Sequence, residues 1–286
     1  PAGGIARQTA RDPAIDDAVV ECGDDLGESH ADRRRSETGE EIAHGVVEHA
    51  DLLALQAGQT RHDLAAPEDL WRVAAEGEQL GKAKGLPIDW PAFADAWRSI
   101  YRPYMDRVGA GKLPWTKLDD LHRQMLEETL LRFGVQILSE DEKQHFNRVW
   151  HRLKPWPDSV PGLQRLKTRF VITTLSNGNI SLLTNMAKHG GLPWDCILSA
   201  ENVRHYKPDA EVYLLVPQLF DLAPDQVMMV AAHEHDLQSA QKYGLHTAFI
   251  HRPLERGAGK AAAVPPTDRY DFVATDMLEL AKQLGV

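Results

Sequence analysis

The sequence predicts an α/β protein with a doubly wound parallel sheet that follows a helical segment. Beyond residue 160, short apolar or β-branched runs alternate with helical stretches, a pattern typical of parallel sheets. Residues 76–150 instead repeat apolar side chains at helical spacing and contain no such runs. Residues 1–70 differ from both, because they contain no Phe, Trp, Tyr, Met or Lys.

The helical segment carries recognisable start and stop signals. Pro91 stands at a plausible first helical position, and Phe93 and Trp97 follow at helical spacing. Ser139 with Glu142 has the pattern of a capping box before another apolar stripe. We expect three or four helices and no strands between residues 76 and 150.

Strands and helices are expected in turn along the alternating region. Apolar runs predict strands at Phe170–Leu175, Ile197–Leu198, Gln226–Ala231, Thr247–Ile250 and Phe272–Ala274. Helical spacing predicts helices at Ile180–His189, Ala210–Phe220, Asp236–Tyr243 and Met277–Leu284. Gly190-Gly191 and Gly244 mark the ends of two of these helices.

The amino-terminal segment does not resemble the rest of the chain. Residues 1–50 carry twelve acids and five arginines with few large apolar side chains, too little to offset chain entropy. One interpretation is a disordered acidic tail, and the other is a stretch read outside the frame of the rest. The predicted division is 1–70 atypical and irregular, 71–155 helical, and 156–286 a Rossmann-like core.

Composition excludes several classes of protein. The formal net charge of −10 disfavours nucleic-acid binding, which depends on Lys and Arg contacting phosphates. No run approaches the ~18 apolar residues of a membrane span, and no secretory signal is recognisable at the start. Two cysteines exclude a disulfide scaffold and a Cys-rich zinc site. We therefore expect a cytoplasmic protein with no nucleic-acid or membrane partner.

Polar residues follow three of the predicted strands, where ligands of doubly wound sheets bind. The segments are Ser176–Asn179, His205–Pro208 and Ala232–Asp236. The first two have a plain alternative, an ordinary turn and a solvated loop lysine, and the two His and two acids of the third suggest a metal site at first sight. His233 and His235 would alternate in an extended segment and no third His lies nearby, so a zinc site is not favoured.

Together the segments LSNGN, YKPD and VMMVAAHEHDLQSAQKYGLHTAFI resemble the haloacid dehalogenase (HAD) superfamily of hydrolases. The resemblance implies a HAD-like sheet with an α-helical cap, inserted after the first strand. Ala232 stands where the superfamily's phosphatases carry an acid for Mg²⁺, because metaphosphate-like transition states need a divalent cation. The metal-free 2-haloacid dehalogenases fit better, with no cofactor. A phosphatase or a non-catalytic chain of this fold remains the alternative.

The resemblance implies hydrolysis of a short 2-haloalkanoic acid to the 2-hydroxy acid through an aspartyl ester. Lys207 would keep the nucleophilic carboxylate ionised, and Asp236 would position Lys207 and the hydrolytic water. The partner is this small substrate, and a homodimer is left open.

The same resemblance implies the residues that bind the substrate. Ser176 and the amides after Asn177 would hold its carboxylate. Arg98, on a cap helix, would stabilise the departing halide together with Asn177. His233 replaces a small polar residue and would suit fluoride as the leaving group.

The nucleophile is the position with the weakest match. Asp63 is the best candidate, since Trp71-Arg72 then falls on a Trp-Arg pair that often follows the nucleophile. However, Ala66-Pro67 replaces the expected Gly-Thr, and polar residues 59–62 precede Asp63 instead of an apolar strand. Asp51 and Asp69 fit less well. Either Asp63 is the nucleophile, or the nucleophile and the first strand are missing. We expect Asp63 not to lie within ~3 Å of Lys207.

Overall fold

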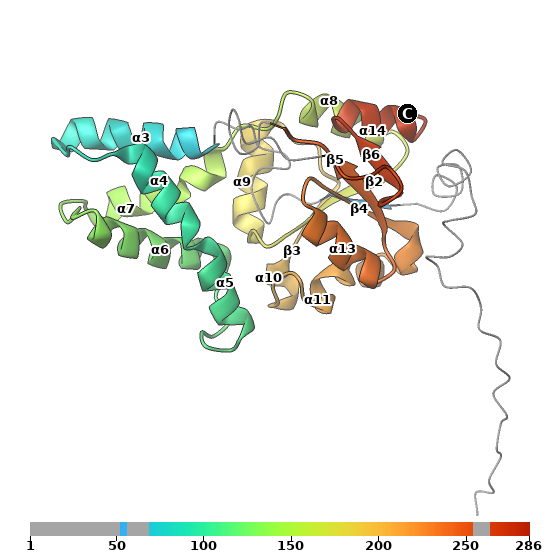
Figure 1. Cartoon of the computed structure of the whole chain (residues 1–286), viewed down its shortest axis with the longest axis horizontal. Coiled ribbons are helices and arrows are strands. Elements are labelled where there is room, and N and C mark those ends of the chain that lie inside the picture. Colours follow the sequence, from blue (N-terminus) through green and yellow to red (C-terminus); the bar gives the residue numbers. More distant parts are fainter. Residues whose placement is uncertain (1–51, 56–68, 254–263) are drawn as a thin grey trace, which may run out of the picture. The chain divides into compact units, whose positions relative to one another are not determined.

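The computed structural model describes residues 52–55, 69–253 and 264–286. Its helical part comprises α3 (Asp69–Lys84), α4 (Trp90–Ser99), α5 (Tyr101–Gly109), α6 (Leu118–Arg132), α7 (Glu140–Asn147) and the 3-10 helix η1 (Arg148–Arg152). These helices gather into one bundle (Figure 1). The bundle and the sheet belong to one compact unit.

The sheet and its covering helices make up the rest of the described chain. The strands are β1 (Leu52–Leu55), β2 (Val171–Ser176), β3 (Cys196–Ser199), β4 (Val227–Ala231), β5 (His246–Ile250) and β6 (Phe272–Ala274). The helices are α8 (Ser159–Leu166), α9 (Ile180–Gly190), α10 (Ala200–Val203), α11 (Ala210–Tyr213), α12 (Leu215–Leu219), η2 (Pro224–Gln226), α13 (Glu234–Lys242) and α14 (Met277–Gln283). All strand pairs are parallel, in the order β3-β2-β1-β4-β5-β6.

Strand β1 corrects the expectation that the first strand is missing. Leu52 pairs with Val171 of β2 and Val227 of β4, so β1 lies in the middle of the sheet. The segment Leu-Leu-Ala-Leu is apolar at every position, a composition typical of the inner strands of parallel sheets. Pattern reading missed it because Leu and Ala are not strong strand formers. Apart from β1 and the start of α3, residues 1–70 lie outside the described residues.

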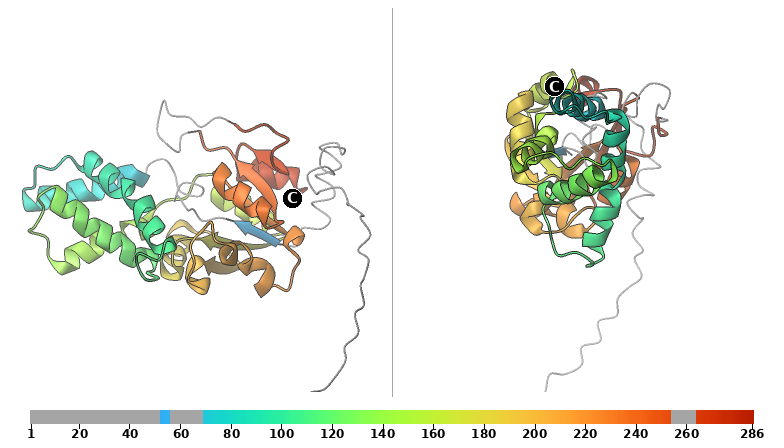
Figure 2. Two further views of the ribbon diagram at one scale, coloured as in Figure 1. Left: turned by 60° about the horizontal axis from the view of Figure 1, so that its bottom comes forward. Right: turned by 90° about the vertical axis from the view of Figure 1, so that its left-hand side faces the viewer.

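The sheet is buried on both faces, and β4 shows this most clearly. Val227, Met229 and Ala231 belong to one hydrophobic cluster, which includes Leu237 of α13. Met228 and Val230 point to the other cluster, which contains residues of α8 and α14. Helices therefore cover both faces of the sheet, as two further views show (Figure 2). The predicted doubly wound α/β class is confirmed.

The helical bundle has an aromatic core. Its rings come from α4, α7 and η1 and lie 5.0–6.3 Å apart between centroids: Trp90, Phe93, Trp97, Phe146 and Trp150. Gly77 and Gly81 on α3 leave room for the Trp90 ring, which a Cβ at either position would strike. The bundle has more helices than the three or four expected, but the capping box at Ser139 is confirmed.

Other boundaries follow the sequence with local exceptions. Phe272–Ala274 forms β6 as predicted. The helix expected over Ala210–Phe220 is divided between α11 and α12, because Pro217 has no N–H to donate to the carbonyl of Tyr213. Within the described ranges, no helix is long and apolar enough to cross a membrane.

Candidate active site

The loop after β2 is fixed by hydrogen bonds from within the core. Ser176 ends β2, and its Oγ accepts a hydrogen bond from the N–H of Gly178 at 3.0 Å. The carbonyl of Gly178 accepts a second one, at 2.6 Å, from Ser199 Oγ at the end of β3. Ser176 and Asn177 are buried. Two adjacent strand ends therefore hold this loop rigidly, as an anion-binding loop requires.

Lys207 connects this loop to the end of β4. Its main-chain N–H donates to Asn177 Oδ1 at 2.9 Å. Its ammonium Nζ lies 3.0 Å from Asp236 Oδ2, and both side chains are completely inaccessible to solvent. Asp236 lies in the first turn of α13, so the pair links segments almost thirty residues apart. The structure thus brings together Asn177, Lys207 and Asp236, which the sequence placed at three separate strand ends.

Tyr213 completes this buried group, and sequence reasoning did not assign it. The hydroxyl of Tyr213 donates to Asp236 Oδ1, the oxygen that Lys207 does not use. The ammonium of Lys207 also lies 5.1 Å from the centre of the Tyr213 ring. Burial, followed by the adjacent Asp236 charge, raises the pKa of Tyr213 well above its usual value. Tyr213 therefore remains a hydrogen-bond donor at neutral pH. The only signal in the sequence was a tyrosine six residues after Lys207.

A small cavity lies against this loop. It measures about 190 Å³ and is lined by Tyr101 and Met105 of α5 together with Asn177, Tyr206 and Lys207. Such a volume is below the ~300–1,000 Å³ typical of sites for drug-sized ligands. The cavity therefore suits a small molecule that contacts both the helical bundle and the sheet.

Arg98 reaches this cavity indirectly. Its guanidinium lies 4.8 Å from the centre of the Tyr101 ring, and Tyr101 is one of the lining residues. Arg98 is in the last turn of α4 and is itself not a lining residue. Arg98 therefore contacts a lining residue of the cavity without lining the cavity itself.

His233 is positioned at the third strand end. It immediately precedes α13, is 8% exposed, and has its ring centroid 5.6 Å from that of His235. Among the described residues, the group geometrically suited to a metal ion is a different one, formed by His205, Asp209 and Glu211. These three side chains are largely exposed, and their contacts with one another are those of a surface ion-pair cluster.

Asp63 lies outside the described residues, so its predicted distance from Lys207 is not tested. The position of β1 nevertheless bears on the assignment of Asp63. The carboxyl end of β1 adjoins those of β2 and β4, because Leu55 pairs with Thr174 and Val230. Asp63 is the first acidic residue after Leu55. It is therefore the first carboxylate in the chain after the central strand.

Comparisons with known proteins agree with this geometry. A family model of haloacid dehalogenase-like hydrolases matches residues 14–244. The chain belongs to the haloacid dehalogenase-like hydrolases. The sheet is the predicted HAD-like core. The helical bundle α3–α7, called the cap below, covers most of the residues for which a helical cap was predicted.

Solved structures and curated relatives specify the branch. The L-2-haloacid dehalogenase PA0810 is 40% identical with a TM-score of 0.76, covering 82% of this chain and 98% of that one. The defluorinating L-2-haloacid dehalogenase Rha0230 is 39% identical with a TM-score of 0.77, covering 83% and 96%. The (S)-2-haloacid dehalogenase 1 of Pseudomonas sp. (strain CBS-3) is 31% identical over 135 residues, 46% of this chain. The match spans 59% of that relative's length. These similarities place the chain in the 2-haloacid dehalogenase branch of the family.

Proposed function

We propose that the protein hydrolyses the carbon–halogen bond of a short 2-haloalkanoic acid, releasing halide and the 2-hydroxy acid. The observation that carries this proposal is the fully buried Lys207–Asp236 pair, capped by Tyr213, beside the Ser176–Asn177 loop. A fixed cation in this position can hold a carboxylate nucleophile ionised. The hydroxyl of Ser176, which accepts from the N–H of Gly178, would donate its own proton to the substrate's carboxylate.

In the first step, a carboxylate oxygen of Asp63 attacks C2 of the substrate. This assignment follows from the position of Asp63 as the first acid after β1, and it requires Asp63 to lie close to Lys207, contrary to the expectation from the sequence alone. A C–O bond forms as the carbon–halogen bond breaks, and the halide leaves with its electron pair, so configuration at C2 inverts. Lys207 orients the nucleophile, while Arg98 and Asn177 stabilise the leaving anion. The small cavity and the carboxylate-binding loop favour two- and three-carbon acids.

In the second step, water attacks the carbonyl carbon of the Asp63 ester. The ester C–O bond breaks on the side of the carboxyl carbon, so the product's hydroxyl oxygen comes from Asp63 and the water oxygen remains in its carboxylate. Asp236 holds Lys207 in place through Oδ2 and Tyr213 through Oδ1. Lys207 is thereby available to favour the return of Asp63 to its charged form.

The acids near β4 support a dehalogenase over a phosphatase. Ala231 and Ala232 occupy the strand end, and neither can bind Mg²⁺. The next acid, Glu234, interacts with Arg269 and Tyr270, and Asp236 is bound by Lys207 and Tyr213. Both carboxylates of this loop therefore have partners other than a metal, while displacement of halide needs no divalent cation.

His233 supports fluoride among the accepted leaving groups. A ring N–H at this strand end would donate to the departing halide, and hydrogen bonds to an anion are charge-assisted. The defluorinating activity named for Rha0230, which is 39% identical, is consistent with this proposal. We expect His233→Asn to lower fluoride release from fluoroacetate about tenfold or more while changing chloride release from chloroacetate much less. Equal losses with both substrates would contradict this role.

The test of the function is halide release by the purified full chain. We expect chloride from (S)-2-chloropropionate, and Lys207→Ala should reduce kcat about 100-fold or more with unchanged circular dichroism. Glu234→Gln is the control, since it removes a charge from the first turn of α13, close in sequence to Asp236, and its partners are Arg269 and Tyr270 instead of Lys207. Phosphate release from a phosphoester without halide release would indicate a phosphatase. No turnover by a folded protein would indicate a non-catalytic chain.

A further inference from the structure

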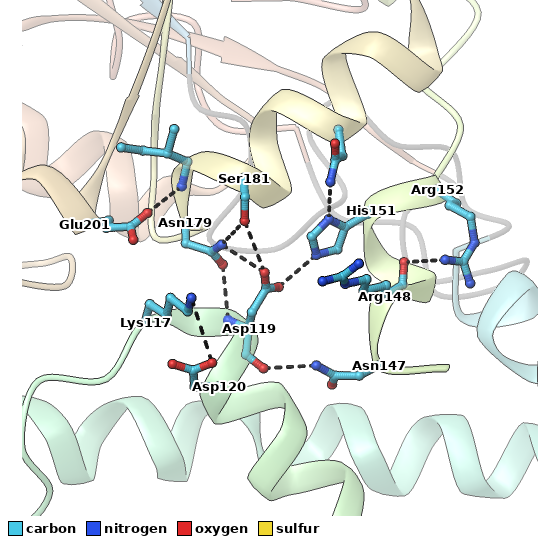
Figure 3. Close-up of polar contacts among 12 residues, drawn as sticks. Lys117, Asp119, Asp120, Asn147, Arg148, His151, Arg152, Asn179, Ser181 and Glu201 are labelled. Carbon is cyan, nitrogen blue, oxygen red and sulfur yellow. Dashed lines mark hydrogen bonds and ion pairs between the residues drawn. The ribbon is translucent and has the colours of Figure 1, made fainter. Parts of the chain in front are cut away.

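Asp119, a carboxylate of the helical bundle, forms two hydrogen bonds with Asn179 beside the sheet (Figure 3). It lies in the first turn of α6, and Asn179 is the residue immediately before α9. Asn179 Oδ1 accepts from the main-chain N–H of Asp119 at 3.1 Å, while Asn179 Nδ2 donates to Asp119 Oδ2 at 2.9 Å. Lys117, the residue that precedes α6, forms no side-chain cap. Asn179, from the sheet domain, therefore takes the place of the missing N-cap side chain at the amino terminus of α6.

The other oxygen of Asp119 is bound as well. His151 Nε2 lies 2.9 Å from Asp119 Oδ1, and Asn185 Nδ2 lies 2.9 Å from His151 Nδ1. Because the Asn185 amide donates to Nδ1, the neutral imidazole carries its proton on Nε2 and donates to Asp119. Ser181 Oγ, in the first turn of α9, is a weaker third donor at 3.4 Å. Two helix amino termini, both favourable for an anion, therefore share one carboxylate.

The core side of this contact is continuous with the proposed substrate loop. Asn179 ends the Ser176–Asn179 segment, whose Asn177 side chain accepts from the main chain of Lys207. A second contact joins the same regions, because the Tyr206 hydroxyl donates to the carbonyl of Thr116 at 2.7 Å. The amino terminus of α6 is thus attached to the loops after both β2 and β3.

On the cap side, the same end of α6 is attached to the segment that carries Arg98. The indole Nε1 of Trp97 donates to the carbonyl of His122, in the first turns of α6, at 3.2 Å. The Tyr101 and His122 rings also lie 6.1 Å apart. A shift of α6 relative to α9 would therefore move Arg98 and Tyr101 relative to the core loops.

We propose that Asp119 is a positioning residue, which sets the distance between the halide-binding Arg98 on the cap and the carboxylate-binding loop of the core. This inference rests on the proposed function, and it assigns Asp119 no contact with the substrate. Halide and carboxylate are the two ends of one small molecule, so a change in this distance lowers the rate more than the affinity.

Asp119→Asn tests the proposal, with Asp120→Asn as the matched control. Both remove one charge from the first turn of α6, but Asp120 is exposed and contacts only Lys117, at 4.0 Å, among the ion pairs described. His151 and Asn179 donate to different oxygens of Asp119. An asparagine replaces one of these oxygens with an NH2 group, which then faces a donor instead of accepting from it. We expect kcat for 2-chloropropionate to fall about ten- to a hundredfold with Asp119→Asn, and less than about twofold with Asp120→Asn.

An exchange of the two side chains separates positioning from stability. In Asp119→Asn/Asn179→Asp, Oδ1 of the new amide accepts from His151, and its Nδ2 donates to the new carboxylate. That carboxylate still accepts the main-chain N–H of residue 119. We expect the double variant to recover most of the lost kcat. In a variant that already carries Arg98→Ala, adding Asp119→Asn should lower kcat by less than about a further twofold, because both changes act on one interaction.

Three results would overturn the proposal: equal effects at Asp119 and Asp120, no rescue by the exchange, or full additivity with Arg98→Ala. If the wild-type chain releases no halide, the proposed function fails and the contact is tested without turnover. Hydrogen exchange followed by mass spectrometry should then be about tenfold faster in residues 176–182 of Asp119→Asn than of Asp120→Asn. Equal exchange in the two variants would show that Asp119 does not hold the loop.

Discussion

Removal of the Asp236 carboxylate should destabilise the protein severely, because it removes a counterion that lies 3.0 Å from a fully buried ammonium group. Lys207 and Asp236 have no solvent-accessible side-chain surface, and their charged atoms are 3.0 Å apart. Loss of one member of such a pair costs about 3–5 kcal/mol. The hydroxyl of Tyr213 loses its acceptor in the same variant. Since domains are stable by only about 5–15 kcal/mol, Asp236→Ala should lose a large share of its stability.

Urea unfolding followed by tryptophan fluorescence measures this loss. Tyr213→Phe, which removes one hydrogen bond to the carboxylate, should cost about 1.5–3 kcal/mol. Asp236→Leu/Lys207→Met removes both charges and should be more stable than Asp236→Ala, because neither charge of the pair then has to be kept away from water. If Asp236→Ala unfolds within about 1 kcal/mol of wild type, or the double variant is less stable than it, the pair is not buried as the structure describes.

Three further predictions concern the metal, the pH and the packing of the cap. Excess EDTA should leave halide release unchanged and added Mg²⁺ should not raise it; a strict Mg²⁺ requirement would contradict the assignment of the β4 loop. Burial opposes ionisation of Asp158, but two 2.8 Å hydrogen bonds from Arg252 and one from the N–H of Met277 hold its pKa below the usual value. The ionised Asp158 therefore contributes its full stabilisation above about pH 4, and this contribution is lost as the pH falls through the lowered pKa. In urea titrations, the free energy of unfolding of Asp158→Asn should therefore fall less between neutral and acid pH than that of the wild type. Gly77→Ala should destabilise the protein by about 1–3 kcal/mol through its clash with Trp90, whereas Gly109→Ala, with no neighbour within 4 Å, should not.

The fold was predictable wherever the local pattern agreed with the tertiary environment. The β-branched run that became β2 and the paired capping residues of α7 each indicated one structure. Strand β1 was missed because its stability comes from pairing on both sides with β2 and β4, not from strand-forming side chains. A four-residue segment that is stabilised by pairing with distant strands cannot be recognised as a strand from its own residues.

The site was predictable only as far as strand ends could be identified. Lys207 and Asp236 each follow a strand, and parallel strands bring their carboxyl ends to one edge of the sheet. Tyr213 follows no strand and reaches Asp236 from α11, so only the structure reveals it. The cap contacts of Asp119 are likewise invisible in sequence, because they join helices sixty residues apart.

A single-turnover reaction in ¹⁸O-water tests the central claim most directly. With enzyme in excess over (S)-2-chloropropionate, we expect chloride release, unlabelled 2-hydroxypropionate and one ¹⁸O atom in the peptide that contains Asp63. Asp63→Asn should release no chloride. Product labelled directly on its hydroxyl with no label in the protein, label on a different acid, or the absence of any chloride would contradict hydrolysis through an Asp63 ester.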